Sequence, residues 1–515
     1  MRYLLIVALL ITGSGIFAQK KLDNYFLLGF YKNLDTIANP RKGGISIEFT
    51  KGAPQVYRKD RQMSFDRDIA IMCNDTGKLL FYTNGIYIND ARDTVMENGD
   101  TLNSGNKEFL DFTNRLSGGW LPYASIIVPM PDEKYYLFHT DYKESVKGNN
   151  DYYPAQIKVS SIDLKYNNGL GKVTRKGKLL WDVGPWEVQG LITATQHANG
   201  RDWWIMTNTF PYNKYVSFLA TPDSIYGPFI QEFGTFDNSN GRGNGGLLFS
   251  PDGTKLAYTN IYGGVVFFDF DRCTGVLSNY RKLPLGPVNS FFGSICFSPN
   301  SKYLYLTNIY NLYQYNTDTS DILSSLQKVD TIDGFIDVFR FTFNFMATGP
   351  NGKIYISSGN GSTFISVIHD PNENGKACNF KQHDLYTNGI YFGFGMPNIP
   401  NYRLGPLKGS PCDTLLVANK EITPADYGLK LFPNPASTDI KIDITLKEYD
   451  PNTKTEVIIV DVSGAIVQKY TMPDFAYIAN LDVSNLPSGV YGVQLRQPKK
   501  FGERILAVEK LVVLR

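Results

Sequence analysis

One pattern of hydrophobic and polar positions recurs six times between residues 71 and 356. An apolar strand runs into a short polar turn, and the turn leads into a second strand rich in Tyr, Ile and Leu. The copies are residues 71–80, 127–136, 193–204, 247–258, 295–306 and 346–356. In the clearest copy the turn is Ser-Pro-Asp-Gly, residues 250–253. Pro presets the first turn angle, Asp caps local N–H groups and Gly accepts a positive φ, so the pattern predicts repeated hairpins.

The spacing of these hairpins indicates blades of a propeller. A basic residue follows each turn, at the start of the second strand, and we expect its side chain to face solvent. These residues are Lys78, Lys134, Arg201, Lys255, Lys302 and Lys353. By subtraction, successive members lie 56, 67, 54, 47 and 51 positions apart. Four-stranded propeller blades repeat roughly every 40–50 residues, and strand-like alternation argues against a helical solenoid.

We therefore predict an all-β chain in which residues 25–405 form a β-propeller of six to seven blades, with seven favoured. Six units are visible in the pattern. A seventh could combine residues 392–397 with N-terminal strands such as residues 44–49. Closing the ring with both chain ends would remove the open strand edges that invite aggregation.

Short strands continue near the C-terminus, after a linker at residues 406–427. Residues 440–444 alternate between apolar and polar, as a half-buried strand does. About seven such strands within residues 428–515 predict a small β-sandwich as a second domain.

The N-terminus has the layout of a secretory signal peptide. Arg2 precedes an apolar run at residues 4–11, and small residues follow. The run is too short to cross a bilayer, which takes about 20 residues. Cleavage between Ala18 and Gln19 fits best, so residues 1–18 are assigned as the signal peptide. The sequence contains no second long apolar run, and we expect no transmembrane segment.

Composition narrows the possible partners. The chain has 515 residues with 51 basic and 49 acidic side chains, and it has no basic tract, so we expect no nucleic-acid partner. Aromatic residues make up 14% of the chain. Its 5 cysteines are too few for a disulfide scaffold, and the odd number leaves at least one thiol without a partner in the chain. The sequence does not determine which of them pair.

Motifs for catalysis, metals or cofactors are scarce. The 4 histidines form no His-Glu-x-x-His pattern, and no Gly-x-Ser-x-Gly is present. His197 lies in a hairpin turn and is interpreted as structural. Residues 241–246 are glycine-rich but lack the Lys-Ser/Thr of a phosphate loop. Residues 370–375 match the first half of an EF-hand loop, but position twelve is Lys381, so a plain turn is the favoured interpretation. We assign no catalytic, metal or cofactor residue.

Four blocks near the C-terminus carry a family resemblance. They are Phe-Pro-Asn-Pro-Ala at 432–436, Asp-Val-Ser-Gly at 461–464, Leu-Pro-Ser-Gly-Val-Tyr at 486–491 and Lys-Leu-Val-Val at 510–513. In this order they resemble a type IX secretion, type A sorting domain, although Phe432 replaces a more usual Tyr. The matching positions are Pro433, Asn434, Pro435, Asp461, Gly464, Gly489, Tyr491 and Lys510. The alternative is an ordinary immunoglobulin-like stalk.

The resemblance implies a route and a partner. A protein with this module crosses the periplasm, is carried through the outer membrane by the type IX secretion machinery, and is released or held at the cell surface after the module is removed. Residues 77–85, 197–200, 268–271 and 397–406 resemble a propeller-like region, of the WD40/YVTN type, seen in many proteins exported by this system. Those blocks are turn and strand residues, so they indicate fold and not chemistry.

For the molecular activity, the leading hypothesis is a non-enzymatic surface protein whose propeller face binds a glycan or a protein. Aromatic-rich segments at residues 181–186 and 386–394, interpreted as loops, motivate it. The alternative is a hydrolase or lyase with its site at the central channel, since the fold alone excludes neither. Convergence of Asp, Glu and His side chains from several blades at one channel mouth would favour the enzyme.

Overall fold

The chain forms two compact units, Met1–Leu415 and Leu416–Arg515, each described here by itself. The computed structural model describes residues 20–30, 41–50, 52–102, 119, 121–144, 152–182, 191–209, 213–234, 245–260, 264–283, 293–413, 427–446, 454–461, 465–472, 478–499 and 502–514. The regular elements of these residues are β-strands and three single-turn 3-10 helices, η1 (Asn167–Gly169), η2 (Leu323–Ser325) and η3 (Gly375–Cys378). The prediction of an all-β chain is confirmed.

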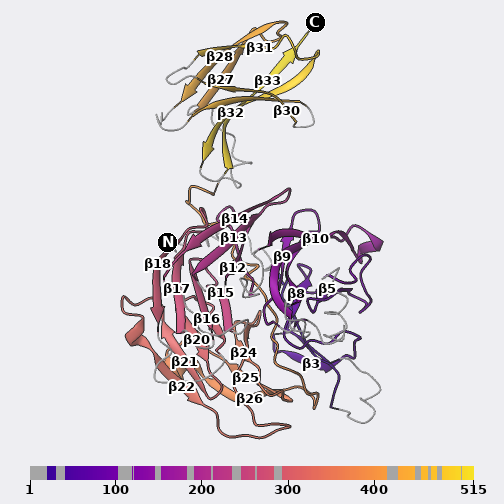
Figure 1. The fold of residues 1–515 in the computed structure, drawn as a ribbon, viewed down its shortest axis with the longest axis vertical. Helices are drawn as coiled ribbons and strands as arrows, with labels where there is room; N and C mark the ends of the chain where they lie inside the picture. Colours follow the sequence, from indigo (N-terminus) through magenta and orange to yellow (C-terminus); the bar gives the residue numbers. More distant parts are fainter. Residues whose placement is uncertain are drawn as a thin grey trace, which may run out of the picture. The chain divides into compact units, whose positions relative to one another are not determined.

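Strands of the first unit, as far as it is described, form seven antiparallel sheets that follow one another in chain order (Figure 1). The first two sheets have three strands and the other five have four. In order they are β1 (Tyr25–Gly29), β2 (Gly44–Glu48), β3 (Gln55–Arg58); β4 (Ala70–Cys73), β5 (Leu79–Thr83), β6 (Ile88–Asp90); β7 (Ser125–Met130), β8 (Lys134–Glu144), β9 (Tyr152–Asp163), β10 (Lys172–Asp182); β11 (Thr193–Gln196), β12 (Trp203–Asn208), β13 (Lys214–Ala220), β14 (Ile225–Glu232); β15 (Gly245–Phe249), β16 (Lys255–Asn260), β17 (Gly264–Phe270), β18 (Leu277–Leu283); β19 (Ile295–Phe297), β20 (Tyr303–Thr307), β21 (Asn311–Asn316), β22 (Gln327–Thr331); and β23 (Met346–Thr348), β24 (Ile354–Ile356), β25 (Phe364–Ile368), β26 (Phe380–Tyr386).

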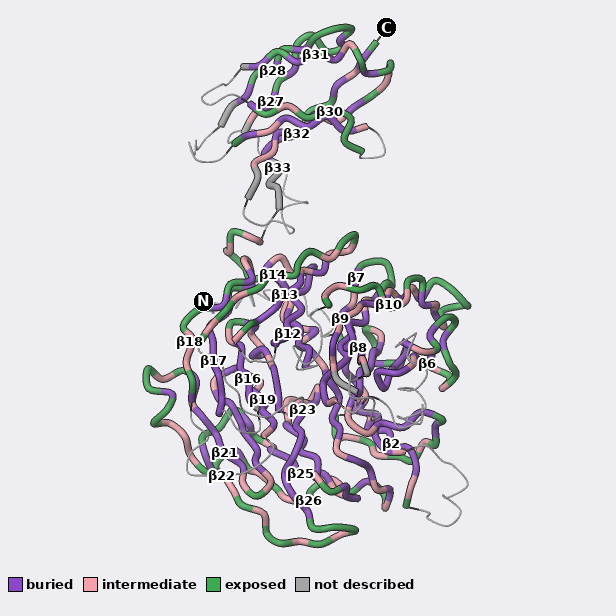
Figure 2. Tube along the Cα trace, in the orientation of Figure 1, coloured by how far each residue is buried: buried purple, intermediate pink, exposed green. Residues whose placement is uncertain are grey.

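These sheets are the blades of a β-propeller. The first strands of neighbouring sheets pack against one another, from β4 and β7 through β11, β15 and β19 to β23. They are buried, whereas outer strands such as β14 alternate between exposed and half-buried positions (Figure 2). The ring closes where Phe26 of β1 and Phe49 lie against Tyr355 of β24, with ring centroids 5.7 and 5.5 Å apart. Aromatic packing therefore joins the first sheet to the last.

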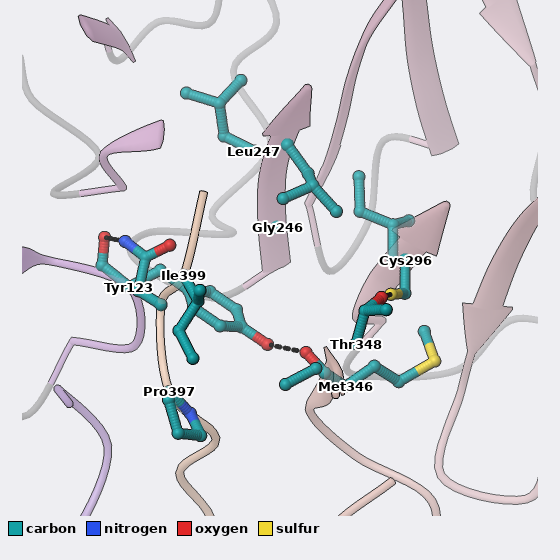
Figure 3. A pocket seen from close by; sticks show the side chains of 12 residues that line it. Tyr123, Gly246, Leu247, Cys296, Met346, Thr348, Pro397 and Ile399 are labelled. Carbon is teal, nitrogen blue, oxygen red and sulfur yellow. Dashed lines mark hydrogen bonds between the residues drawn. The ribbon is translucent and has the colours of Figure 1, made fainter. Parts of the chain in front are cut away.

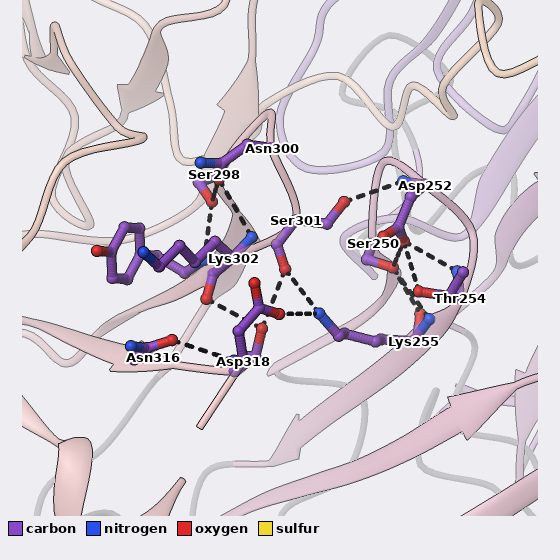
Figure 4. Close-up of polar contacts among 12 residues, drawn as sticks. Ser250, Asp252, Thr254, Lys255, Ser298, Asn300, Ser301, Lys302, Asn316 and Asp318 are labelled. Atoms are coloured by element: carbon purple, nitrogen blue, oxygen red, sulfur yellow. Dashed lines mark hydrogen bonds and ion pairs between the residues drawn. The ribbon is translucent and has the colours of Figure 1, made fainter. Parts of the chain in front are cut away.

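Each of the six repeated turns joins the first two strands of one sheet, and their side chains explain the pattern. In one turn, Asp252 Oδ1 accepts the Thr254 N–H at 3.0 Å and Ser250 Oγ accepts the Lys255 N–H at 3.0 Å. The next turn repeats these bonds with Ser298 and Asn300 (Figure 4). Ser301 there has a φ of 60° where the other turn has Gly253 at 71°.

The pattern predicted that the basic residue after each turn faces solvent. Lys255 does not follow this prediction. Lys255 Nζ donates to the Ser301 carbonyl at 3.1 Å and pairs with Asp318 at 2.7 Å, both on the following sheet (Figure 4). Its side chain is therefore only 16% exposed. A long flexible side chain at a blade turn reaches the neighbouring blade, a contact that the spacing along the chain cannot reveal.

The first sheet of the ring also differs from the prediction, in which both chain ends contribute to one blade. It consists of β1, β2 and β3, while residues 392–397 add no strand to it. Those residues instead lead into a segment that runs beside residues 66–69, with the Gly395 N–H on the Asp66 carbonyl at 2.7 Å and the Asn398 N–H on the Ile69 carbonyl at 2.8 Å. A Cβ at position 395 would lie 2.7 Å from the Asp66 oxygen, so this close approach requires glycine.

The second unit is a β-sandwich of two sheets. One has the order β27 (Tyr427–Phe432), β28 (Asp439–Leu446) and β31 (Ile478–Asp482). The other has the order β30 (Ile466–Thr471), β29 (Glu456–Val460), β32 (Gly489–Lys499) and β33 (Gly502–Val513). Alternate residues of both sheets, among them Ile442, Ile459 and Val493, form one buried core. The predicted sandwich is confirmed.

Candidate functional site

The centre of the propeller is occupied by the chain's own residues 395–407, here called the central plug. Asn398 anchors it, because its Nδ2 donates to three carbonyls of the third and fourth blades. These belong to Ile192 at 2.8 Å, Ser125 at 3.0 Å and Tyr123 at 3.3 Å. One side chain thus binds the inner ends of two blades, at the central channel where the alternative, enzymatic hypothesis places its site.

Further along, the plug bonds to other inner strands. The Tyr402 hydroxyl donates to the Ile127 carbonyl at 2.8 Å, and Asn401 Nδ2 donates to the Pro251 carbonyl at 2.7 Å. Arg403 makes a bidentate ion pair with Asp23, in which Nη1 lies 2.6 Å from Oδ2. The side chains of Asp23 and Arg403 are only 6% and 18% exposed. These bonds and the ion pair hold a polar segment inside the ring.

After the plug, the chain stays on the propeller. The Leu407 N–H donates to the Ala198 carbonyl at 2.9 Å, and Cys412 forms a disulfide with Cys273. Residues 406–413, which the pattern assigned to a linker, therefore belong to the propeller unit. Of the five cysteines, Cys73, Cys296 and Cys378 are free and buried. The odd count predicted at least one free thiol, but only the fold brings together two cysteines 139 residues apart.

A small cavity of about 60 Å³ lies beside the plug (Figure 3). The hydroxyl of Tyr123 crosses this space and donates to the Met346 carbonyl at 3.0 Å. Cys296 Sγ lies 3.2 Å from Thr348 Oγ1. Burial raises the pKa of the Cys296 thiol to about 12, so it is a neutral thiol and not a nucleophile at neutral pH. The cavity offers packing and no chemistry.

On the side of the repeated turns, the plug forms the floor of a wider funnel of about 300 Å³. Three turn prolines, Pro251, Pro299 and Pro350, come from consecutive blades and line it together with hydroxyl side chains such as Thr195. Among the described residues that line it, the ionisable ones are Asp23 and Arg403, and these two neutralise each other. In the described part of the chain, no three His, Cys, Asp or Glu residues form a metal-binding group.

The buried carboxyl group of Asp68 contacts the plug indirectly, through Ser125. Asp68 accepts the Ser125 N–H at 2.9 Å and the Ser125 hydroxyl at 2.6 Å, and the carbonyl of the same serine accepts Asn398. Complete burial raises the pKa of Asp68 to about 7, against the hydrogen bonds from Ser125, which lower it. Asp68 thus links the inner strand β7 to the loop before β4, and it titrates near neutral pH.

This raised pKa gives stability a specific pH dependence. The unfolded chain loses the Asp68 proton near 3.8 and the folded chain near 7, so the folded state becomes less stable as pH rises through this window. In the Asp68→Asn variant this contribution disappears. Relative to the variant, the wild type should lose up to about 4 kcal/mol of unfolding free energy between these pH values. Denaturant unfolding across the window measures it, and parallel curves for the two proteins would contradict it.

Residues of the sequence-predicted sorting motif come together on the second unit. Asn434 follows β27, its Nδ2 donates to the Lys510 carbonyl of β33, and its Oδ1 accepts the Val512 N–H at 2.9 Å. Gly489 and Tyr491 of β32 lie opposite Val513 and Leu511 of β33. Pro433 and Pro435 flank Asn434. Asp461 follows β29, and its Oδ1 accepts the Ala465 N–H at 3.0 Å. Gly464, Ala18 and Gln19 lie outside the described residues.

Other sequence candidates have structural roles. Asp370 accepts Asn379 Nδ2 at 3.0 Å and Asn372 Oδ1 accepts the Asn300 N–H at 3.0 Å, so the EF-hand-like loop bonds to the residues that follow it and to the preceding blade. His197 accepts the Asn199 N–H at 3.0 Å and contacts the Cys273 carbonyl at 3.1 Å, and burial lowers its pKa. Both favoured interpretations, a turn and a structural histidine, agree with this geometry.

The two aromatic-rich segments are only partly loops. Trp181 lies in β10, and residues 183–190 are outside the described residues. Tyr386 ends β26 and is exposed, but Ile390 and Phe392 are buried in the propeller core. The sequence pattern does not predict the plug. The Pro-Asn pairs at residues 397–398 and 400–401 are its available signal of an irregular, hydrogen-bonded segment.

Comparison with known proteins identifies the second unit. Residues 430–509 match the family model described as the secretion system C-terminal sorting domain. The C-terminal unit is a type IX sorting domain. The protein that carries this sorting domain is therefore secreted or taken to the cell surface. Among the described residues, no helix is long and apolar enough to cross a membrane.

Solved structures similar to the sorting-domain protein are propellers of low identity. A protein from Bacteroides uniformis assigned as a 6-phosphogluconolactonase is 14% identical, with 73% of this chain and 98% of that chain covered and a TM-score of 0.44. The periplasmic gluconolactonase of Pseudomonas aeruginosa is 14% identical over 72% and 96% of the two chains, with a TM-score of 0.39. None of the curated proteins compared with the sequence matches it.

Proposed function

We propose that the exported propeller is a binding module and not an enzyme, and that its ligand is a protein. The observation that carries this proposal is the central plug. Propeller enzymes need reactive groups at the channel, but here the chain fills the channel itself. The ionisable residues described around the remaining funnel, Asp23 and Arg403, are bonded to each other, which leaves neither free to transfer a proton.

The surface best suited to a ligand is an apolar patch on the sixth and seventh blades, here called the aromatic patch: Tyr310, Phe335, Ile336, Phe339, Phe364 and Tyr386. Ile336 is 69% exposed and Phe339 is 51% exposed. Phe364 connects the patch, with ring centroids 5.6 Å from Phe335 and 5.0 Å from Tyr386. Large exposed apolar groups that adjoin one another mark interaction sites more often than scattered ones do.

The chemistry of the patch favours a protein over a glycan. Sugars bind to flat aromatic faces with hydrogen-bonding groups beside them, but Ile336 and Val338 offer neither. The exposed Arg340 lies in the same hairpin, and Tyr, Phe and Arg together are typical of protein interfaces. The patch lies at the opposite end of the blades from the funnel, because successive turns of an antiparallel sheet alternate between its two ends.

Two assays on the full-length protein test this proposal. In the first, a panel of lactones, glycosides, esters and peptides should show no turnover. In the second, labelled protein should bind to cell envelopes of the producing bacterium, and protease treatment of the envelopes should remove the binding. The change of Ile336 and Phe339 together to Ser should lower the binding at least about tenfold, as loss of interface hot spots does.

A matched control is Tyr226→Ser, which removes an exposed aromatic ring from β14, away from the patch. This variant should bind like the wild type. Turnover of any substrate would contradict the binding-module proposal. Binding that survives protease but is lost after removal of polysaccharide would contradict the protein ligand and favour a glycan.

A further inference from the structure

Lys158 and Asp141 form an unusually buried amine–carboxyl pair in the third blade. Lys158 of β9 contacts Asp141 Oδ2 of the neighbouring strand β8 through its Nζ, and the two side chains are 13% and 10% exposed. In every other lysine–carboxylate pair found among the described residues, at least one side chain is more than a third exposed. Within the described part of the chain, only this pair holds a lysine amine against a carboxyl with both side chains largely shielded from water.

A simple ion pair would contribute little to stability at this buried position. Two charges taken out of water lose several kcal/mol of hydration each, and their attraction often only offsets the loss. The pair lies on the sheet face that includes Leu137 and Tyr135, which packs on the second blade through Phe81 at a ring distance of 5.2 Å. Burial raises the pKa of Asp141, which favours the neutral acid.

The carboxyl is also polarised by its own backbone. Asp141 Oδ1 accepts the Tyr142 N–H at 2.8 Å. A donor on this oxygen draws electrons from the carboxyl carbon and stabilises the negative charge that develops when an amine adds to it. Oδ2, the oxygen that faces Lys158, is then the one able to leave.

A buried histidine lies opposite Lys158. His139 is directly opposite Lys158 in the register of β8 and β9. It is fully buried, and its Nδ1 has no hydrogen-bond partner among the described residues. Its other nitrogen, Nε2, lies 3.4 Å from the Ser160 hydroxyl. Burial, and next the charge of Lys158, lower the pKa of His139 to about 3, so the ring is neutral and adds no charge beside the pair.

We propose that Lys158 and Asp141 become joined by an intramolecular amide bond after the propeller folds. The Lys158 amine, as –NH₂, adds through its lone pair to the carboxyl carbon of the protonated Asp141. The N–C bond forms, the C–Oδ2 bond breaks, and Oδ2 leaves as water. One proton passes from the nitrogen to Oδ2, which Nζ contacts directly, so atoms and charges balance. The step requires neither an oxidant nor a cofactor, and the fixed contact supplies the high effective concentration that amide formation in water otherwise lacks.

The mass of the purified full-length protein tests the bond directly. After disulfide reduction and denaturation, the wild type should weigh one water molecule less than its sequence predicts. Trypsin should fail to cut after Lys158, and a branched peptide should link the segments that contain Asp141 and Lys158. The Lys158→Arg variant keeps the charge but lacks the nucleophilic amine, and it should show the full mass.

A further variant separates chemistry from folding. Lys143→Arg alters the exposed partner of Asp182 and should still lose one water. A wild-type protein of full mass that is cut after Lys158 would overturn the proposal. Water loss that persists in Lys158→Arg would overturn it as well. If Lys158→Arg does not fold, the mass and the branched peptide of the wild type decide alone.

Discussion

Deletion of residues 416–515 should abolish the appearance of the protein outside the cell while leaving a folded propeller in the periplasm. The deleted residues contain the whole sorting domain, residues 430–509, and form their own compact unit with their own core. The propeller keeps its plug and its disulfide, which end at Cys412. Immunoblots and mass spectrometry of the cell, envelope and medium of a host with the type IX system measure the change.

A finer variant tests whether the clustered motif residues carry the signal. Asn434→Ala removes the side chain that bonds to β33 at Lys510 and Val512 without shortening the chain. We expect it to reduce export strongly, whereas Asn480→Ala on β31 should not. Export of the truncated protein at the wild-type level would show that the second unit is an ordinary sandwich domain, the alternative to the sorting interpretation.

Replacement of Arg403 by Ala should be among the most destabilising single changes in the propeller. It leaves the Asp23 carboxylate, whose side chain is only 6% exposed, without its bidentate guanidinium partner. Removal of one member of a buried pair typically costs about 3–5 kcal/mol, because the other charge remains unpaired and dehydrated. The free energy of unfolding in urea measures this loss, and limited proteolysis should cut the plug of the variant first.

Two comparisons make this result specific. Lys214→Ala breaks the exposed pair with Glu232 and should change the unfolding free energy by less than about 1 kcal/mol. The double change of Asp23 and Arg403 to Ala removes both charges and should cost less than the sum of the single changes. If Arg403→Ala is as stable as Lys214→Ala, the plug is not held by this pair.

Local rules were enough to predict the hairpins. The Ser-Pro-Asp-Gly turn at residues 250–253 and its relatives fold through bonds within five or six residues, so their identity and order are readable in the chain. The strand pattern likewise predicted the sandwich, and the four motif blocks predicted the sorting domain. Asn434 and Lys510 were selected as motif positions, but their hydrogen bond is visible only once β27 and β33 lie together.

The centre of the propeller was decided by tertiary structure alone. Asn398 binds carbonyls more than 200 residues away, and Arg403 pairs with Asp23 at a separation of 380 residues. No local propensity encodes such contacts, since they exist only after seven blades have closed around residues 395–407. The sequence by itself thus determined the C-terminal sorting domain, the repeated hairpins and the class of fold. The folded ring determined that the channel is filled, that Cys273 meets Cys412, and that Lys158 lies buried against Asp141, because burial and long-range pairing arise only when distant segments pack.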